Sequence, residues 1–250
     1  LERQIPHEWE VRSGGHDFTC WNTALPKAFR FINEYFNGKR SGNSESSLPN
    51  ETPFIQTANA TVYYPEQAQG STRKYPIIYV QGEINEQQQK VLVSQFHQMV
   101  DENKTWPAVL CFVKANTDLS ETISDIEKQL SGIRGSQRMR ALITLGDNIK
   151  EGIEAIQGEN LFTGIVCVNA IGNENDAQNL IKAVNSYKRY PRCWIEILPE
   201  SKEYGFSSNI HILLKESDLE HEFRSRKCKE ANVFTYWEDW ILYLNNRIHV

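Results

Sequence analysis

Two histidines lie in loops that follow a predicted strand and precede a predicted helix. His16 is part of the loop GGHD (residues 14–17), and His221 is part of LEHEF (residues 219–223). A histidine can take the proton of a hydroxyl or thiol nucleophile when a nearby carboxylate orients its ring. Either histidine could therefore act as a general base, provided that the chain also supplies a nucleophile and an acid.

A nucleophile for such chemistry stands on a tight turn between a strand and a helix. The segment TLGDN (residues 144–148) fills such a turn, because an apolar run precedes it and a helical pattern follows it. Its central residue is Gly146. Shifting the register by one or two residues brings Leu145, Asp147 or Asn148 to the same place. None of the four is a serine or a cysteine, so the turn predicts no acyl-transfer nucleophile.

The other candidates for chemistry each have a simpler interpretation. Asp147 could act as a carboxylate nucleophile, but its bulky neighbours favour a solvated loop aspartate. Ser136 precedes a predicted strand instead of following it, which is the wrong context for a nucleophile. Glu200 or Glu203 could supply the acid, and both also fit an ordinary charged turn.

From residue 60 onward the sequence alternates strand and helix patterns. The strand-like runs are short, continuous and apolar, as expected of strands buried on both faces of a parallel sheet. They span residues 60–64, 76–81, 108–114, 141–145, 164–169, 193–198 and 209–214. Helical patterns span residues 86–101, 120–130, 149–157 and 175–187. The alternation predicts an α/β fold with a mostly parallel, helix-covered central sheet.

A polar stretch divides the chain into unequal parts. Residues 38–55 indicate a linker, which leaves residues 1–37 as a strand–helix tail segment and residues 56–250 as the main domain. A strand at 8–11, the His16 loop and a helix at 24–36 follow one another, and the same order recurs as a strand at 209–214, the His221 loop and a helix at 233–245. We interpret these stretches as two copies of one terminal unit.

The segment GGHDFTCWNTALPKAFRFINEYF (residues 14–36) combines a Gly-Gly-His-Asp-aromatic loop with a Trp and a final helix. It resembles the end of esterases of the esterase D and enterochelin-esterase type. The resemblance implies that His16 is the catalytic base of a preceding esterase domain, of which residues 1–37 are the tail. A glycine-rich turn with an incidental histidine is the alternative.

The main domain resembles the same family, which implies a three-layer α/β-hydrolase-like sandwich. ATVYYPEQAQGSTRKYPIIYVQGE (residues 60–83) is similar to the family's opening, whose first central strand ends at an oxyanion-hole loop. Here that strand ends in Gln81 and Gly82, with glutamine where the family has histidine. MRALITLGDNIKEGIEAIQGENLFTGIVCVNA (residues 139–170) is similar to the nucleophile-elbow region, with Gly146 in the serine position.

The resemblance also places the remaining members of a catalytic triad. His221 aligns with the family's catalytic histidine, although the Gly-Gly before it has become Leu-Glu. The acid follows the strand at 193–198, which makes Glu200 or Glu203 the candidates. Only ten residues separate that strand from the next predicted one, at 209–214, which leaves little room for the helix expected after the acid.

Composition narrows the classes of function. A net charge of −5 without a basic cluster argues against nucleic-acid binding. No apolar run approaches the roughly 18–20 residues that span a bilayer. The five cysteines form no CxxC pair and predict no metal site, and no glycine-rich phosphate loop follows a strand, so no cofactor is indicated. The compartment stays open between bacterial periplasmic or secreted and cytoplasmic.

Three hypotheses follow. The first is a pseudo-esterase with a binding or structural role beside an active esterase domain, with room for a small ester, acyl or carbohydrate-like ligand. The second is an active carboxylic-ester hydrolase with a composite site using His16 or His221, in which residues 1–36 pack against the turn at Gly146. The third is a Rossmann-like nucleotide binder. An unpaired terminal strand and helix would also favour a swapped homodimer.

Overall fold

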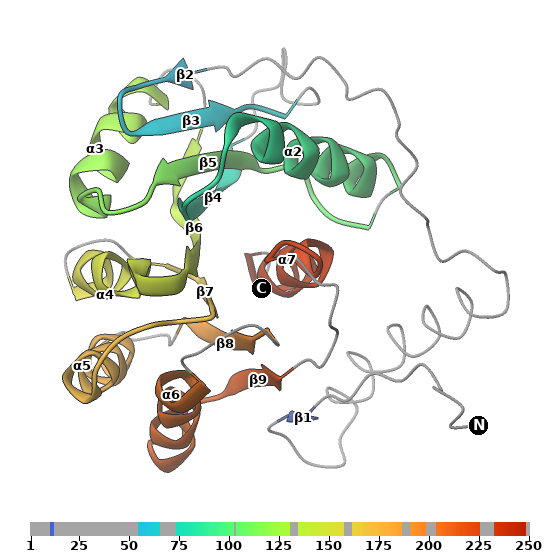
Figure 1. Ribbon diagram of the computed structural model, residues 1–250. Coiled ribbons are helices and arrows are strands. Elements are labelled where there is room, and N and C mark those ends of the chain that lie inside the picture. The colour runs from blue at the N-terminus through green and yellow to red at the C-terminus, as the bar shows by residue number, and fades with distance from the viewer. Residues whose placement is uncertain are drawn as a thin grey trace, which may run out of the picture.

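A computed structural model of the chain describes residues 11–12, 55–65, 74–102, 104–130, 135–157, 162–186, 191–198, 204–225 and 233–248. Their backbone forms one central sheet with helices on both faces (Figure 1). The predicted helix at 24–36, the His16 loop and most of the predicted linker lie outside the described residues.

The sheet has nine strands in the order β1-β9-β8-β7-β6-β4-β5-β3-β2. The strands are β1 (Val11–Arg12), β2 (Ile55–Gln56), β3 (Ala60–Tyr63), β4 (Tyr75–Gly82), β5 (Val109–Lys114), β6 (Gly135–Leu145), β7 (Gly164–Val168), β8 (Arg192–Ile197) and β9 (His221–Ser225). The strands from β5 to β9 in this order pair in parallel, whereas β2, β3 and β1 add antiparallel edges.

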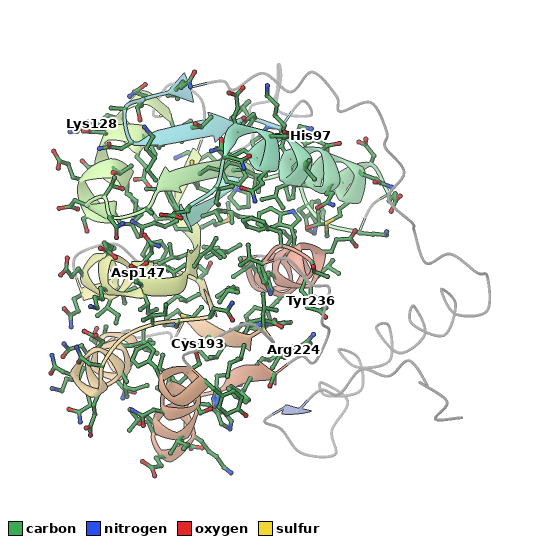
Figure 2. All side chains as sticks on the ribbon, in the orientation of Figure 1. His97, Lys128, Asp147, Cys193, Arg224 and Tyr236 are labelled. Carbon is green, nitrogen blue, oxygen red and sulfur yellow. The ribbon has the colours of Figure 1, made fainter. Side chains whose placement is uncertain are left out.

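Helices cover both faces of the sheet (Figure 1). They are α2 (Glu86–Asp101), α3 (Leu119–Leu130), α4 (Ile149–Gln157), α5 (Glu174–Asn185), α6 (Tyr204–Glu216) and α7 (Trp237–Ile248). The helices α2 and α7 lie on one face, and α3, α4, α5 and α6 lie on the other. Side chains fill the space between each helix layer and the sheet (Figure 2), so that each face has its own apolar core. This three-layer sandwich confirms the predicted fold class.

Most central strands and several helices have bounds within two residues of the predicted ones, because their local signals agree with their burial. The strand β6 is an exception, since it begins at Gly135, six residues before its predicted start. All five residues of β7 and all eight of β4 are buried, as expected for strands covered on both faces. The helix α2 begins with a capping box, in which the Asn85 side chain accepts from the Gln88 backbone N–H at 2.9 Å and the Gln88 side chain accepts from the Asn85 N–H at 3.0 Å.

The predicted strand at 209–214 is wrong, because these residues belong to α6. The buried residues Phe206, Ile210 and Leu214 recur every fourth position and form one helical face, whereas Ile212 is half exposed. The strand that follows is β9, whose sequence HEFRS is too polar to be recognised as buried. The thirteen-residue helix α6 therefore fills the interval that had seemed too short for a helix.

The described part of the N-terminal segment is β1, slightly later than the predicted strand at 8–11. It pairs antiparallel with β9, with Val11 opposite Phe223 and Arg12 opposite Glu222. Because β9 is the last strand of the parallel part of the sheet, β1 closes that edge of the main domain.

Candidate functional site

Gly146 stands on the turn between β6 and α4, where a short 3-10 segment (Gly146–Asn148) links strand to helix. Its φ is +63°, in the left-handed region that glycine adopts without strain. A Cβ at this position would have no heavy atom within 4 Å. The turn therefore has room for a side chain, but its backbone favours glycine.

The close packing of strand on helix next to this turn depends on a glycine of the helix. Thr144, two residues before Gly146, is fully buried in β6. A Cβ on Gly152 of α4 would lie 2.9 Å from the Thr144 Cγ2, which is closer than atoms can pack. Gly152 thus provides the space that a glycine at position 144 would otherwise supply.

Asn148 holds the turn in its observed shape. Its buried side chain donates from Nδ2 to the carbonyl of Leu145 at 2.7 Å, and its Oδ1 accepts from the backbone N–H of Asn116 at 3.0 Å. Asn116 belongs to the turn after β5 and has a φ of +56°. The amide side chain therefore links the β6–α4 turn to the neighbouring β5–α3 turn.

The end of β4, the predicted oxyanion-type loop, lies against the same turn. A Cβ on Gly82 would lie 2.8 Å from Leu145 Cδ1, so the leucine side chain occupies the space above this glycine. Gln81 is fully buried, and its Nε2 donates to the carbonyl of Thr117 at 3.0 Å. In this arrangement the Gln81 side chain connects the end of β4 to the β5–α3 turn, and the Leu145 side chain packs against Gly82.

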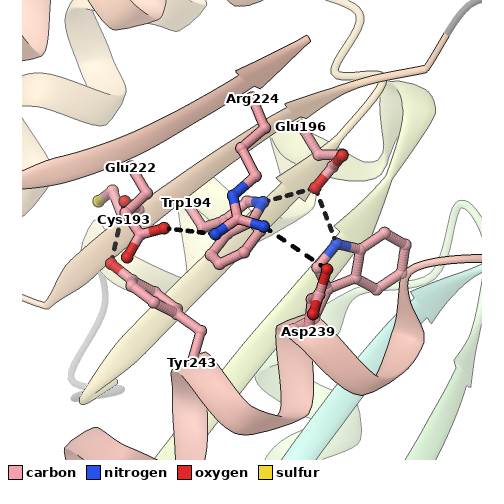
Figure 3. Close-up of polar contacts among 8 residues, drawn as sticks. Cys193, Trp194, Glu196, Glu222, Arg224, Asp239 and Tyr243 are labelled. Atoms are coloured by element: carbon pink, nitrogen blue, oxygen red, sulfur yellow. Dashed lines mark hydrogen bonds and ion pairs between the residues drawn. The ribbon is translucent and has the colours of Figure 1, made fainter. Parts of the chain in front are cut away.

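A buried carboxylate at the end of β8 was not predicted from the sequence. Glu196 is fully buried, and its Oε2 accepts from the indole N–H groups of Trp194 at 2.7 Å and Trp240 at 3.1 Å (Figure 3). Alternation in β8 places Trp194 and Glu196 on the same face, which is the only sequence signal that could have paired them. The carboxylate joins α7 to the sheet.

An arginine lies beside this carboxylate under α7. The Arg224 guanidinium contacts Glu222 at 3.2 Å and Asp239 at 3.5 Å, and its Cζ lies 3.9 Å from the centre of the Trp194 ring (Figure 3). The Tyr243 hydroxyl donates to the Cys193 carbonyl at 3.1 Å. These contacts bind α7 to β8 and β9, and they identify the cluster as a structural network.

Solved structures resemble this chain in three dimensions. A ferulic acid esterase matches 76% of this chain and 92% of its own length with a TM-score of 0.57 and 11% identity. The S-formylglutathione hydrolase FrmB from Staphylococcus aureus matches 76% and 89% at a TM-score of 0.56 and 12% identity. The serine hydrolase FphF from the same organism matches 80% and 96% at 0.55 and 14% identity.

The fold is that of the esterase-like α/β-hydrolases. At these identities the likeness concerns the fold alone. No protein-family model matches the sequence, and no curated protein matches it.

The structure places His221 in a different element from the one that the sequence predicted. This residue begins β9 and does not lie in a loop before a helix. The pairing register across β8 and β7 aligns His221 with Leu142 of β6. The two residues are three strands apart, and Leu142 precedes Gly146 by four residues. Ordinary strand spacings make the distance between the His221 and Gly146 Cα atoms roughly 20 Å. His221 and Gly146 therefore do not form one site.

The buried His221 instead pairs with His211 of α6, which is partly exposed. The His221 Nδ1 donates to the Leu219 carbonyl at 2.7 Å, so its Nε2 accepts from His211 Nδ1, also at 2.7 Å. The His211 ring stacks on Phe223. Burial, His221 and Lys215 lower the pKa of His211.

The histidine pair predicts a fall in stability with acidification. Because the pKa of His211 is lower in the folded chain than its ordinary value of 6.5, the unfolded chain binds more protons as the pH drops through that value. We expect the free energy of unfolding to decrease from pH 7 to pH 5, and His211→Gln to remove most of that decrease. Urea denaturation at each pH measures it. His97→Gln on α2 is the control, and equal slopes in all three proteins would refute the prediction.

The thiols of the described residues are not suited to be nucleophiles. Cys111, Cys167 and Cys193 are buried and free of disulfides. Burial raises the pKa of Cys167 to about 12 and also raises the pKa of the other two thiols. A thiolate at neutral pH is therefore negligible at these positions.

The remaining predicted site residues do not converge. Asp147 is exposed, as expected of a loop aspartate. Ser136 lies near the amino end of β6, inside the strand rather than before it, and at the edge opposite Gly146. Glu200, Glu203 and His16 lie outside the described residues.

Two further observations concern ligands. A shallow cavity of about 220 Å³ opens beside Gly82, between β3, β5 and the start of α2, and includes Glu86 and Lys114 in its lining. Within the described ranges no group of three or more His, Cys, Asp and Glu side chains could hold a metal ion.

None of the described helices has the length and apolar character of a membrane span.

Proposed function

We propose that this α/β-hydrolase-fold domain is a pseudo-esterase, a scaffold without acyl-transfer activity that has a binding or structural role beside an active esterase domain. The observation that carries the proposal is Gly146. It stands on the strand-to-helix turn with open space above it, and it has no hydroxyl or thiol to attack an ester.

Two further features support the proposal. The resemblance to esterases implies a histidine between the last strand and the final helix, but residues 226–236 between β9 and α7 read RKCKEANVFTY and contain none. Leu145 covers Gly82, where an oxyanion would need access to backbone N–H groups. Each of these features removes a different component of the reaction.

The alternative is an active carboxylic-ester hydrolase with a composite site that uses His16. The geometry of β1 does not favour it. The strand β1 lies four strands from β6, and because it is antiparallel to β9 its carboxyl end at Arg12 lies at the end of the strands opposite Gly146. The segment that carries His16 would have to reverse its direction and cross the domain.

The proposed role includes binding of a small ligand that is not chemically converted. The cavity beside Gly82 has glutamate and lysine side chains in a partly apolar wall, which suits a small acyl or carbohydrate-like molecule. Such binding would use the scaffold and not the turn at Gly146.

The test combines active-site labelling with a serine restored at the turn. We expect the wild-type chain to give no adduct with a fluorophosphonate probe by intact mass, and no hydrolysis of a short nitrophenyl ester above that of Gly146→Ala. Gly146→Ser should fold with a loss of about 1–2 kcal/mol, because an L-residue is strained in this conformation. It should also stay unlabelled, because a serine without a base is not activated.

Stoichiometric labelling of one serine in the wild-type chain, located by peptide mapping, would contradict the proposal, because it would make the domain an esterase. Labelling of Gly146→Ser alone would leave the wild-type chain inactive but would contradict the loss of the other components, because it would require a working base at the turn. Circular dichroism spectra of the variants confirm that each is folded before labelling.

A further inference from the structure

A six-residue motif occurs twice in the chain, and its second copy contains β9. Residues 8–13 read EWEVRS and residues 220–225 read EHEFRS, 212 positions apart. Four of the six positions are identical, and a fifth is apolar in both. The match becomes visible only when the last strand is placed at His221–Ser225 instead of 209–214.

The repeat continues beyond the strand at the same spacing. The helix α7 begins at Trp237, whose counterpart is Leu25, at the start of the helix predicted for residues 24–36. Thr23 and Asn33 are identical to their counterparts, Thr235 and Asn245. Beyond the strand the repeat therefore rests on this common spacing, since only these two of the 23 positions from 14 to 36 are identical.

The structure pairs the two copies in a symmetric register. Val11 lies opposite Phe223. Phe223 is 212 positions further along the chain, so it is also the residue that corresponds to Val11 in the repeat. Arg12 lies opposite Glu222, so pairing moves one residue forward on β1 and one residue back on β9. Two copies of one strand that pair antiparallel are related by a local two-fold axis, and here the axis passes between Val11 and Phe223. A shift by one residue would move the axis between residue positions, so that no residue would lie opposite its counterpart.

Such a pairing is what two related domains make when they join through their last strands. An edge strand presents unpaired backbone N–H and C=O groups to any strand of matching pattern. We infer that the β9 edge is a two-fold docking edge, and that its partner is a second α/β-hydrolase-type domain whose last strand is β1. The two sheets then continue into one another across the β1–β9 pair, with their strands running in opposite directions.

This inference deepens the proposed structural role, since it names the partner and the surface of the pseudo-esterase. Its test reads strand pairing, whereas probe labelling reads the chemistry at Gly146. Either idea can therefore fail while the other stands.

The test asks whether β9 can replace β1 at its own edge. Val11→Pro removes a backbone donor from β1 and blocks its pairing. If the edge is two-fold, β9 of one chain should then pair with β9 of a second, with Phe223 opposite Phe223. Phe223→Cys in this background should form an intermolecular disulfide, because directly opposite Cα atoms in an antiparallel pair lie about 4.5–5.5 Å apart. Cys20 and Cys228 are first changed to serine.

Ser225→Cys is the matched control on the same strand. In the two-fold register it lies opposite residue 221 of the second chain, so that two copies of it stand about 13 Å apart and cannot bond. We expect a doubling of molar mass by light scattering with Val11→Pro, a disulfide-linked dimer with Phe223→Cys, and a non-covalent dimer with Ser225→Cys. With β1 intact, Phe223→Cys should remain monomeric.

The inference is overturned if the folded Val11→Pro, Phe223→Cys chain stays monomeric, or if both cysteine variants cross-link equally. Circular dichroism establishes folding first. Should Val11→Pro lose its structure, Arg12→Pro serves in its place, because it blocks the neighbouring backbone position of β1 and the same two readouts apply.

Discussion

Glu127→Ala should lower the free energy of unfolding by about 3–5 kcal/mol, because it leaves a buried guanidinium without its partner. Glu127 of α3 accepts from the Nε of Arg140 at 2.5 Å and from its Nη2, and the Tyr79 hydroxyl donates to the same carboxylate at 2.9 Å. Glu127 and Arg140 are at most 9% exposed. The contacts join α3 to β6 and β4. Urea denaturation followed by circular dichroism measures the loss.

The adjacent residue provides the control for this prediction. Lys128 forms an ion pair with Asp125 at 3.3 Å, but its side chain is 73% exposed. Lys128→Ala should therefore change the stability by no more than about 0.5 kcal/mol. A loss below about 1 kcal/mol for Glu127→Ala, at the level of a surface pair, would show that the buried pair is not the tie between α3 and the sheet.

Trp240→Ala should be comparably destabilising, at about 3–5 kcal/mol, because it opens a large cavity between α7 and the sheet. Trp240 is completely buried, and its indole N–H donates to Glu196. Trp240→Phe keeps most of the ring and removes the hydrogen bond, so we expect a smaller loss of about 1–2 kcal/mol. Denaturation by urea, with the same probe for each variant, gives the ranking.

An exposed tryptophan is the control that distinguishes the effect of burial from the effect of removing any tryptophan. Trp106 is 55% exposed, and Trp106→Ala should change the stability by about 0.5 kcal/mol or less. If Trp240→Ala and Trp106→Ala had similar effects, α7 would not be held to the sheet by the cluster around Glu196.

The parts of the fold that could be predicted from sequence are those whose local signals agree with their burial. The helices α2 and α4 begin and end at the predicted residues, because each has an apolar face and a capping box marks the start of α2. The strand β7 is apolar throughout, and β4 and β5 are apolar except at Gln81 and Lys114 near their carboxyl ends. Gly146 was placed on its turn for the same reason, since an apolar strand and an amphipathic helix enclose it.

The errors occurred where polar residues are buried. The strand β9 contains His221, Glu222 and Arg224, all largely buried, so its composition indicated a loop. Its neighbour α6 offered a more apolar run and was predicted as the strand. Partners from distant elements make the polar strand possible, since Arg224 reaches Asp239 of α7 and His221 reaches His211 of α6.

The interactions around the turn could not be predicted for a related reason. Asn148 stabilises it through Asn116, which is 32 positions away, and Gly152 accommodates Thr144 from the facing helix. Such contacts depend on which side chains tertiary structure brings together, and no periodicity in the sequence reports them. Glu196 likewise acquires its role only when α7 places Trp240 above it.

The positive φ of Gly146 bears on the balance between stability and activity in this scaffold. Enzymes commonly hold reactive residues in strained conformations and lose stability by doing so. A glycine in this conformation carries no such strain, and any other residue would cost about 1–2 kcal/mol. Relieved of that cost, the domain can accumulate destabilising substitutions elsewhere on its surface before it falls below the threshold for folding. As the pseudo-esterase that we propose, the domain would therefore be freer than an enzyme to evolve a new binding surface.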